Sequence, residues 1–501
     1  MLGRRKIYTN IKIITRKNII DILKKAYSIH KQNVYDMQFL IDFERGIQPL
    51  QRPKKVRPDI DIRTISSLPN YIKEFNIGYN WGSPVMLVQR GNNELHRTDP
   101  NTDDLGISAL NEQLKNIENI GYKDQCMAEF VEITGIGHKM VDIKTDFPES
   151  LDEMYVGSLV EDYYLDSRYA FCVYYNGPGQ KKLIGATYVE YEGKTYFTCT
   201  TDRWRFEIED WKIVGQQINP LGMVNIVEFE RLPDRTGCFE RAIPKIDALN
   251  ILESDFANDV SQRTQELWWG DNIEFKEDEN GNSVRPKSGD WILTVSTDGK
   301  VAKIQPLSSS FDGGSTLNSI ADSRTTILQD CYVPIQYSSS GGGSTGTATD
   351  MSSGWSAAEL MAKRKQQVTE RAKREELELI LRAFKQVPTH ILSKDSPLRK
   401  IHVSDIEIKV LRDKNFDMSI RANTFATYFN CGVYPLHILQ ATGGFADPQQ
   451  VFNDSCDMLL AIQKKMIDSE TNENQENNTS DDLVNQTENS PIIDGLSIKE
   501  G

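Results

Sequence analysis

The sequence lacks the signatures of most enzyme and metal-protein classes. Its seven cysteines are scattered and never form C-x-x-C, so neither a disulfide framework nor a zinc knuckle is indicated. Its six histidines are equally dispersed, without H-E-x-x-H, and no G-x-S-x-G elbow is present. From these absences we expect no catalytic residues, no metal site and no cofactor.

Long apolar runs are missing as well. The sequence contains no run of about 18 apolar residues, the length that a membrane-spanning helix needs. The beginning, MLGRRKIYTNIKIITRK, lacks the apolar core of a signal peptide. Hydrophobic residues still make up 39% of the 501 residues, with 19 Tyr, 19 Phe and 7 Trp, which is enough for several cores. We therefore expect a globular protein that is made in the cytoplasm and has no membrane partner.

Negative charge exceeds positive charge over the chain as a whole, but the beginning of the chain is basic. The net charge is −14, yet residues 1–30 hold eight Lys or Arg against Asp21, and residues 468–501 hold nine Asp or Glu against Lys499. The acidic body disfavours tight generic binding of nucleic acid, which depends on Lys and Arg neutralising phosphates. The polar C-terminal region is predicted to be disordered, either as a solubilising tail or as a segment that folds onto a partner.

Glycine and serine are concentrated in SSSGGGSTGTATDMSSGWS, residues 338–356. Gly341, Gly343 and Gly346 fit G-x-G-x-x-G, but the preceding CYVPIQY contains a proline and no second βαβ unit follows. Thr347 stands where a Walker A loop needs its lysine, so phosphate binding is disfavoured. Two interpretations remain: a flexible linker, or a loop whose backbone approaches something large.

Hydrophobic periodicity predicts an α+β N-terminal half followed by long helices. Helical patterns occur before Gly46 and near residues 67–79 and 107–120, and short strands bounded by turn residues fill 153–230. Residues 243–269 read as one amphipathic helix of about 25 residues, or about 37 Å. Strand patterns with Asn280-Gly281 and Asp298-Gly299 turns come next, then a second helix.

A helix of about 30 residues is predicted from Trp355 to Phe384. It carries KRK at 363–365 and RAKREE at 371–376, which form either a solvated face with i to i+4 ion pairs or a surface facing DNA or another subunit. A strand pattern and three short helices follow it.

Several stretches of the chain resemble one family of proteins. They are NIGYNWGSPVMLV, GIGHKMVDI, NIVEFE followed by GCFERAIPKIDALNILESDFANDVSQ, SGWSAAELMAKRKQQVTERAKREEL and NCGVYPLHILQATGGFADPQQ. In content and order they are similar to portal proteins of tailed bacteriophages, the class found in phages of Gram-positive hosts. The resemblance spans roughly residues 60–460 and rests on the order of elements more than on any single motif.

The resemblance implies an α+β portal-type fold with a wing, a helical stem, a small α/β clip and a helical crown, assembled as a ring of twelve copies. It implies the following boundaries: N-terminal region and wing 1–242, stem helix 243–269, clip 270–307, returning stem helix 308–337, tunnel loop 338–353, long wing helix and wing strand 354–419, crown 420–467 and acidic tail 468–501.

The implied location is the portal vertex of the virion capsid, with synthesis in the host cytoplasm. The ring would pass double-stranded DNA without sequence specificity, and it would dock the terminase large subunit, a head-tail adaptor protein, and the major capsid and scaffold proteins. The implied DNA-channel loop consists of Ser340, Gly341, Gly342, Gly343, Ser344, Thr345, Gly346, Thr347, Thr349 and Met351. The implied channel or inter-subunit charges are Lys363, Arg364 and Lys365, and the implied clip docking residues are Asn272, Glu274, Lys276, Asn280 and Trp291.

Two other functions stay open at this stage. A DNA-processing enzyme would need a metal-binding carboxylate cluster or a nucleotide loop, and the sequence supplies neither. A virion structural protein other than a portal could use the long helices as coiled coils, but sustained heptads are lacking. A closed ring would favour the portal over both.

Overall fold

A computed structural model describes residues 3–50, 60–89, 106–147, 157–263, 268–271, 303–306, 313–335, 354–410, 412 and 418–435, and also residues 438, 439, 451, 452, 455 and 458. The chain divides into two compact units, Met1–Asp413 and Lys414–Gly501. In the second unit, helix α10 (Met418–Asn430) stacks Phe425 on Phe429, with ring centroids 6.2 Å apart.

The first unit mixes helices and sheets. Its strands are β1 (Ile7–Thr9), β2 (Met86–Gln89), β3 (Ile136–Ile143), β4 (Val160–Leu165), β5 (Ala170–Tyr175), β6 (Lys182–Tyr191), β7 (Lys194–Thr200), β8 (Trp204–Glu209), β9 (Lys212–Ile218), β10 (Ile226–Glu230), β11 (Trp268–Asp271), β12 (Lys303–Pro306) and β13 (Ile406–Lys409). Its α-helices are α1 (Ile19–Glu44), α2 (Leu68–Trp81), α3 (Ile107–Asn111), α4 (Ile120–Thr134), α5 (Ile243–Arg263), α6 (Gly313–Asp330), α8 (Trp355–Gln386) and α9 (Pro397–Lys400).

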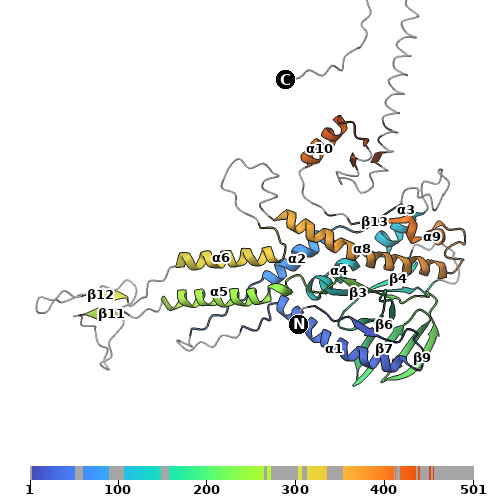
Figure 1. Ribbon diagram of the computed structural model, residues 1–501, viewed down its shortest axis with the longest axis horizontal. Helices are drawn as coiled ribbons and strands as arrows, with labels where there is room; N and C mark the ends of the chain where they lie inside the picture. Colours follow the sequence, from blue (N-terminus) through green and yellow to red (C-terminus); the bar gives the residue numbers. More distant parts are fainter. Residues whose placement is uncertain are drawn as a thin grey trace, which may run out of the picture. The chain divides into compact units, whose positions relative to one another are not determined.

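The largest sheet has six strands in the order β1-β5-β6-β7-β8-β9. β1 pairs with β5 in parallel, and the other neighbours are antiparallel. Phe206 and Ile208 of β8 are buried while Glu207 between them is exposed, as a strand with one covered face requires. Helix α1 covers that face with Ile19 and Leu23, and Figure 1 shows it lying along the sheet.

A second sheet, β10-β3-β4, is antiparallel and packs against helices α4 and α8. Its core includes Val131 of α4, Val141 of β3, Phe229 of β10 and Phe384 of α8, all nearly inaccessible to solvent. Strand β2 pairs antiparallel with the distant strand β13 in a separate two-stranded sheet, with Gln89 opposite Ile406 and Met86 opposite Lys409.

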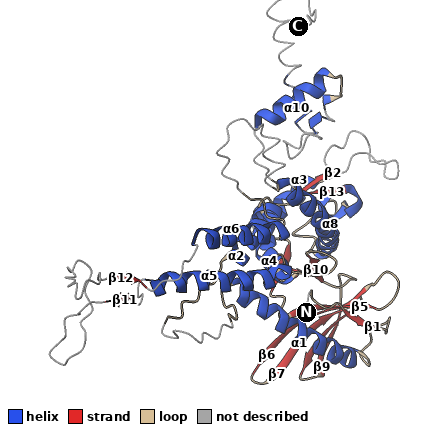
Figure 2. Cartoon of the chain, turned by 60° about the vertical axis from the view of Figure 1, so that its left-hand side comes forward, coloured by secondary structure: helices blue, strands red, loops and turns tan. Residues whose placement is uncertain are grey.

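Helices α5 and α6 pack side by side, and Figures 1 and 2 show β11 and β12 beyond their ends. Ile246 and Leu249 of α5 share a core with Ile320 and Ile327 of α6. Strands β11 and β12 pair antiparallel, with Trp268 opposite Pro306. The chain thus runs outward along α5 and β11 and returns antiparallel along β12 and α6.

The GIGHKMVDI stretch shows why glycine is needed where α4 ends. Gly135 has a φ of +84°, a left-handed conformation that glycine adopts without strain. A Cβ atom at this position would lie 2.1 Å from the carbonyl oxygen of Arg235. Gly135 therefore lets the chain reverse from α4 directly into β3 against a neighbouring backbone.

The predicted α+β class agrees with this mixture of helices and antiparallel sheets. The predicted strands at 182–191 and 195–201 correspond to β6 and β7, and the helix before Gly46 corresponds to α1. The predicted helix at 243–269 was too long, because α5 ends at Arg263 and Trp268 lies in β11. Helix α4 and strands β4 and β9 were missed by the pattern analysis.

Candidate functional site

Ion pairs join α5 to α6 along their shared length. Arg324 of α6 lies 2.9 Å from a carboxylate oxygen of Glu253 on α5, and the Glu253 side chain is 8% exposed. Lys245 of α5 pairs with Asp330 near the end of α6. Together with the apolar core, these contacts hold the two helices as one antiparallel pair.

An extended segment, residues 60–66, lies along α5, and we refer to it as the strap. Asn258 accepts a hydrogen bond from the Ile62 amide at 2.8 Å and donates one to the Ile62 carbonyl at 3.0 Å. Further along α5, Ser254 accepts from the Thr64 amide at 2.9 Å and Asn250 accepts from the Ser66 amide at 2.8 Å. Three polar side chains therefore bind the backbone of three alternate strap residues.

The spacing of these contacts follows from the two backbone geometries. Four residues of an α-helix rise about 6.0 Å, and two residues of an extended chain rise about 6.6 Å. Asn250, Ser254 and Asn258 are four residues apart, and Ser66, Thr64 and Ile62 are two apart in the opposite direction. The helix can thus bind an antiparallel strap through its backbone at successive turns.

Helix α8 contributes Lys365 to a buried ionic cluster. The Lys365 ammonium lies 3.0 Å from Glu132 on α4 and donates to Asn76 on α2 at 2.6 Å. Arg231 donates to the same Glu132 carboxylate at 2.8 Å. Burial, followed by the charge of Arg231, lowers the pKa of Lys365 to about 8. Burial alone would raise the pKa of Glu132, but the two cations outweigh it and hold that pKa below its usual range.

A second buried cluster, the Lys139 cluster, joins α8 to α4, β3 and β4. Lys139 lies 2.7 Å from Asp162 and 3.0 Å from Asp124, and it also pairs with Glu376. Lys373 lies 2.6 Å from Asp124 and 2.7 Å from Glu376. Three carboxylates thus face two ammonium groups, and every one of these side chains is at most 6% exposed.

The carboxylates of the Lys139 cluster have unequal surroundings. Burial raises the pKa of Asp162 to about 6, and Lys139 offsets that rise only in part. Burial acts on Asp124 in the same direction, but Lys139 and Lys373 together bring its pKa below the usual range. The difference arises because Asp124 lies against two ammonium groups while Asp162 lies against one.

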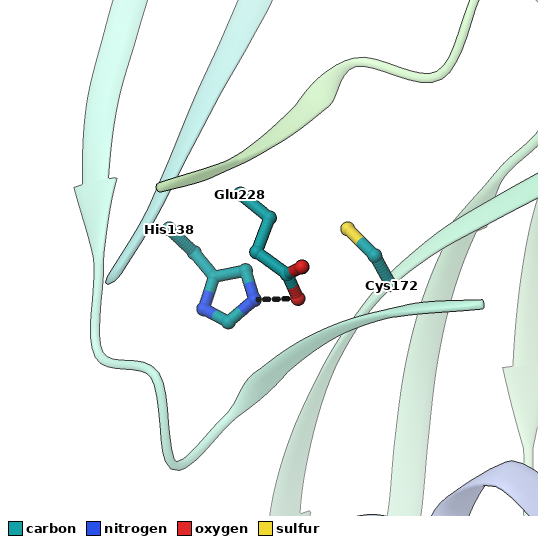
Figure 3. Close-up of side chains that lie close together, drawn as sticks. All are labelled: His138, Cys172 and Glu228. Atoms are coloured by element: carbon teal, nitrogen blue, oxygen red, sulfur yellow. Dashed lines mark ion pairs between the residues drawn. The ribbon is translucent and has the colours of Figure 1, made fainter. Parts of the chain in front are cut away.

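His138, Cys172 and Glu228 form a third polar group, between β3, β5 and β10 (Figure 3). One ring nitrogen of His138 lies 3.4 Å from Glu228, and the other is 3.0 Å from the Ser167 hydroxyl. Glu228 also accepts a hydrogen bond from Tyr174 at 2.8 Å and pairs with Arg235.

This third group fits a metal ion poorly, although its three ligand atoms lie within 4.8 Å of one another. Arg235 already neutralises Glu228. Burial raises the pKa of the Cys172 thiol, which opposes the thiolate that a metal would need. These contacts make His138, Cys172 and Glu228 a buried polar network that joins the two sheets.

The structure separates the three basic residues predicted as channel or inter-subunit charges. Lys363 and Arg364 are exposed, whereas Lys365 is buried and held by Glu132. The alternative of a solvated face with i to i+4 ion pairs describes only part of α8: Lys363 is exposed and lies 3.9 Å from Glu359, whereas Lys365, Lys373 and Glu376 are buried. The predicted channel loop at 338–353 lies outside the described residues, as do the predicted docking residues Asn272, Glu274, Lys276, Asn280 and Trp291.

Comparison with known families bears on the elements just described. The family model described as "Phage portal protein, SPP1 Gp6-like" matches residues 160–404. This match confirms the resemblance to phage portal proteins. It begins at the first residue of β4, includes α5, α6 and α8, and ends just before β13. No curated protein matches the chain.

The matched residues contain α5, α6 and α8, but the match adds no site residue. None of the described helices combines the length and hydropathy of a membrane span. Pattern analysis missed the strap and both lysine clusters. One signal was present for the strap, since Asn250, Ser254 and Asn258 recur every four residues on an otherwise amphipathic helix.

Proposed function

We propose that the chain is the subunit of a ring-shaped portal at one vertex of a phage capsid. Double-stranded DNA would be packaged and ejected through the centre of a ring of twelve copies. The observation that carries the proposal is the portal-family match over residues 160–404, which contain α5, α6 and α8. No enzymatic step is part of this role, since the portal family is a structural one.

The antiparallel α5–α6 pair supports the proposed stem. Its two helices are held by the Ile246–Ile327 core and by the Arg324–Glu253 ion pair. The paired strands β11 and β12 follow α5 and precede α6, where a clip between two stem helices would stand. In this proposal the six-stranded and three-stranded sheets belong to the wing, and α10 belongs to the crown.

The proposed clip, residues 270–307, would dock the terminase large subunit during packaging and a head-tail adaptor afterwards. Strand edges on neighbouring copies could pair or form a composite surface at the narrow end of a ring. The major capsid and scaffold proteins would contact the outside of the ring.

The proposed tunnel loop, residues 338–353, would approach DNA inside the ring. Its sequence is rich in Gly, Ser and Thr, which permit close backbone approach and weak hydrogen bonds without reading bases. The acidic charge of the chain agrees with a channel wall that does not hold the duplex tightly.

Native mass spectrometry and electron microscopy of the purified protein test the proposal. We expect a closed ring with a central hole. A stable monomer that hydrolyses ATP or cleaves DNA would refute the portal and favour a DNA-processing enzyme. A filament or sheet without a central hole would favour a different virion structural protein.

A further inference from the structure

Helix α8 has buried basic residues on one face and exposed basic residues on the opposite face. Lys365 and Lys373 point inward to buried carboxylates. Arg364, Arg371 and Arg374 are exposed, and we refer to these three residues as the arginine row. Their positions, separated by seven and three residues, return to nearly the same side of an α-helix.

The arginine row has no ion-pair partner among the described residues, whereas Lys363 and Arg382 of the same helix do. Lys363 lies 3.9 Å from Glu359, and Arg382 lies 2.7 Å from Glu378. Three acidic residues lie near the row: Glu370 accepts from the neutral Gln366, Glu375 pairs with Lys182, and Glu378 pairs with Arg382. A chain with a net charge of −14 thus keeps three guanidinium groups on one exposed helix face.

The dimensions of the row suit an extended anionic ligand. At 1.5 Å per residue, Arg364 and Arg371 are about 10.5 Å apart along the axis, and Arg374 is about 4.5 Å further. A DNA duplex carries one negative charge per about 1.7 Å of its axis, so long arginine side chains can reach separate phosphates over this span. Guanidinium groups also bind phosphate oxygens through two parallel hydrogen bonds.

The composition of this face favours DNA over a second copy of the chain. Around the row lie Lys363 and Gln367, both exposed, and the exposed large apolar residue of this face is Leu360 at one end. Permanent protein interfaces are depleted of charge at their centres and enriched in apolar and aromatic residues. A polar face that exposes several guanidinium groups has the character of a phosphate-contacting surface.

We propose that the arginine row of α8 contacts the backbone phosphates of duplex DNA without reading its sequence. This inference rests on the proposed portal function, in which DNA passes through the protein. It adds a specific, limited contact to an otherwise acidic protein. Of the three residues expected from the sequence, Lys363, Arg364 and Lys365, the row keeps Arg364, and it adds Arg371 and Arg374.

Fluorescence anisotropy with a labelled duplex of about 30 base pairs tests the inference on the full-length protein, at salt concentrations from about 50 to about 200 mM. The test variant carries Arg364→Gln, Arg371→Gln and Arg374→Gln. The control variant carries Lys12→Gln, Lys17→Gln and Lys25→Gln, which removes the same charge from another exposed surface. Arg371→Gln alone serves as a milder variant, and circular dichroism verifies that each variant is folded.

The wild-type protein should bind the duplex, and the arginine variant should bind it more weakly, with a Kd increase above about tenfold near 100 mM salt. Because each phosphate contact contributes about 0.9 to the slope of log K against log salt, the slope should decrease by about 2.7. Arg371→Gln should decrease it by about 0.9, while the control variant should keep the wild-type slope.

Other outcomes overturn the inference in distinguishable ways. Equal losses in the arginine and control variants would show a general charge effect. Unchanged DNA binding with altered ring assembly, seen by native mass spectrometry, would assign the row to contacts between copies. If the wild-type protein forms rings that do not bind the duplex, the inference fails and the portal function stands. If it forms no ring, the proposed function itself fails.

Discussion

Replacing Asp162 with asparagine should remove a pH-dependent cost from the Lys139 cluster. Burial raises the pKa of Asp162 from 3.8 to about 6. Between these values the folded protein binds a proton that the unfolded chain releases, so this group makes the folded state less stable as the pH rises. Its contribution changes from about pH 4 to about pH 6 and is complete above that range.

The size of the effect follows from the shift. A difference of about two pKa units corresponds to about 3 kcal/mol of unfolding free energy. The Asp162 side chain is fully buried, so solvent does not screen this interaction. In the Asp162→Asn variant, two carboxylates would face two ammonium groups, and the excess negative charge of the cluster would be gone.

Urea unfolding of wild type and variant, followed by tryptophan fluorescence from about pH 4 to about pH 7, measures the difference. Relative to wild type, Asp162→Asn should gain up to about 3 kcal/mol of unfolding free energy as the pH rises. Asp124→Asn is the matched control, because the pKa of Asp124 is lowered, so its stabilising contribution is present above about pH 4 and is lost only as the pH falls further. That variant should therefore be less stable than wild type by a nearly constant amount from about pH 4 to about pH 7. A difference between wild type and Asp162→Asn that stays constant with pH would refute the reasoning.

Three further predictions address the α5–α6 pair and the proposed portal function. Replacing Asn250, Ser254 and Asn258 with alanine should accelerate amide hydrogen exchange at Ile62, Thr64 and Ser66 and lower the free energy of unfolding by about 1 kcal/mol per lost hydrogen bond. Exchange in β7 is the unaffected reference, and unchanged exchange in the strap would contradict the hydrogen bonds between the strap and α5. Deleting residues 272–300 should leave rings intact but abolish binding of the terminase or the adaptor in pull-down assays, and retained binding of both would disprove the clip assignment. Deleting residues 340–343 should preserve ring assembly and alter DNA content per particle, whereas a plain linker predicts wild-type filling because loop closure depends weakly on length.

The sequence by itself determined the local elements and the portal resemblance. Alternating apolar residues predict β6 and β7, and apolar residues at steps of three and four predict α5 and α8. These patterns succeed because side-chain direction along a strand or helix depends on local backbone geometry. The end of α5 was less predictable, since the same residues can continue a helix or pair as β11 with a strand that begins at Lys303.

Only the tertiary structure decided how the charges are used. KRK and RAKREE look alike as sequence, yet Lys365 meets Glu132 across 233 residues and Lys373 meets Asp124 across 249. Arg364 and Arg371, on the outer face of the same helix, meet solvent. A sequence pattern gives the face on which a side chain lies, but its pKa and its partners depend on which distant strands and helices pack against that face.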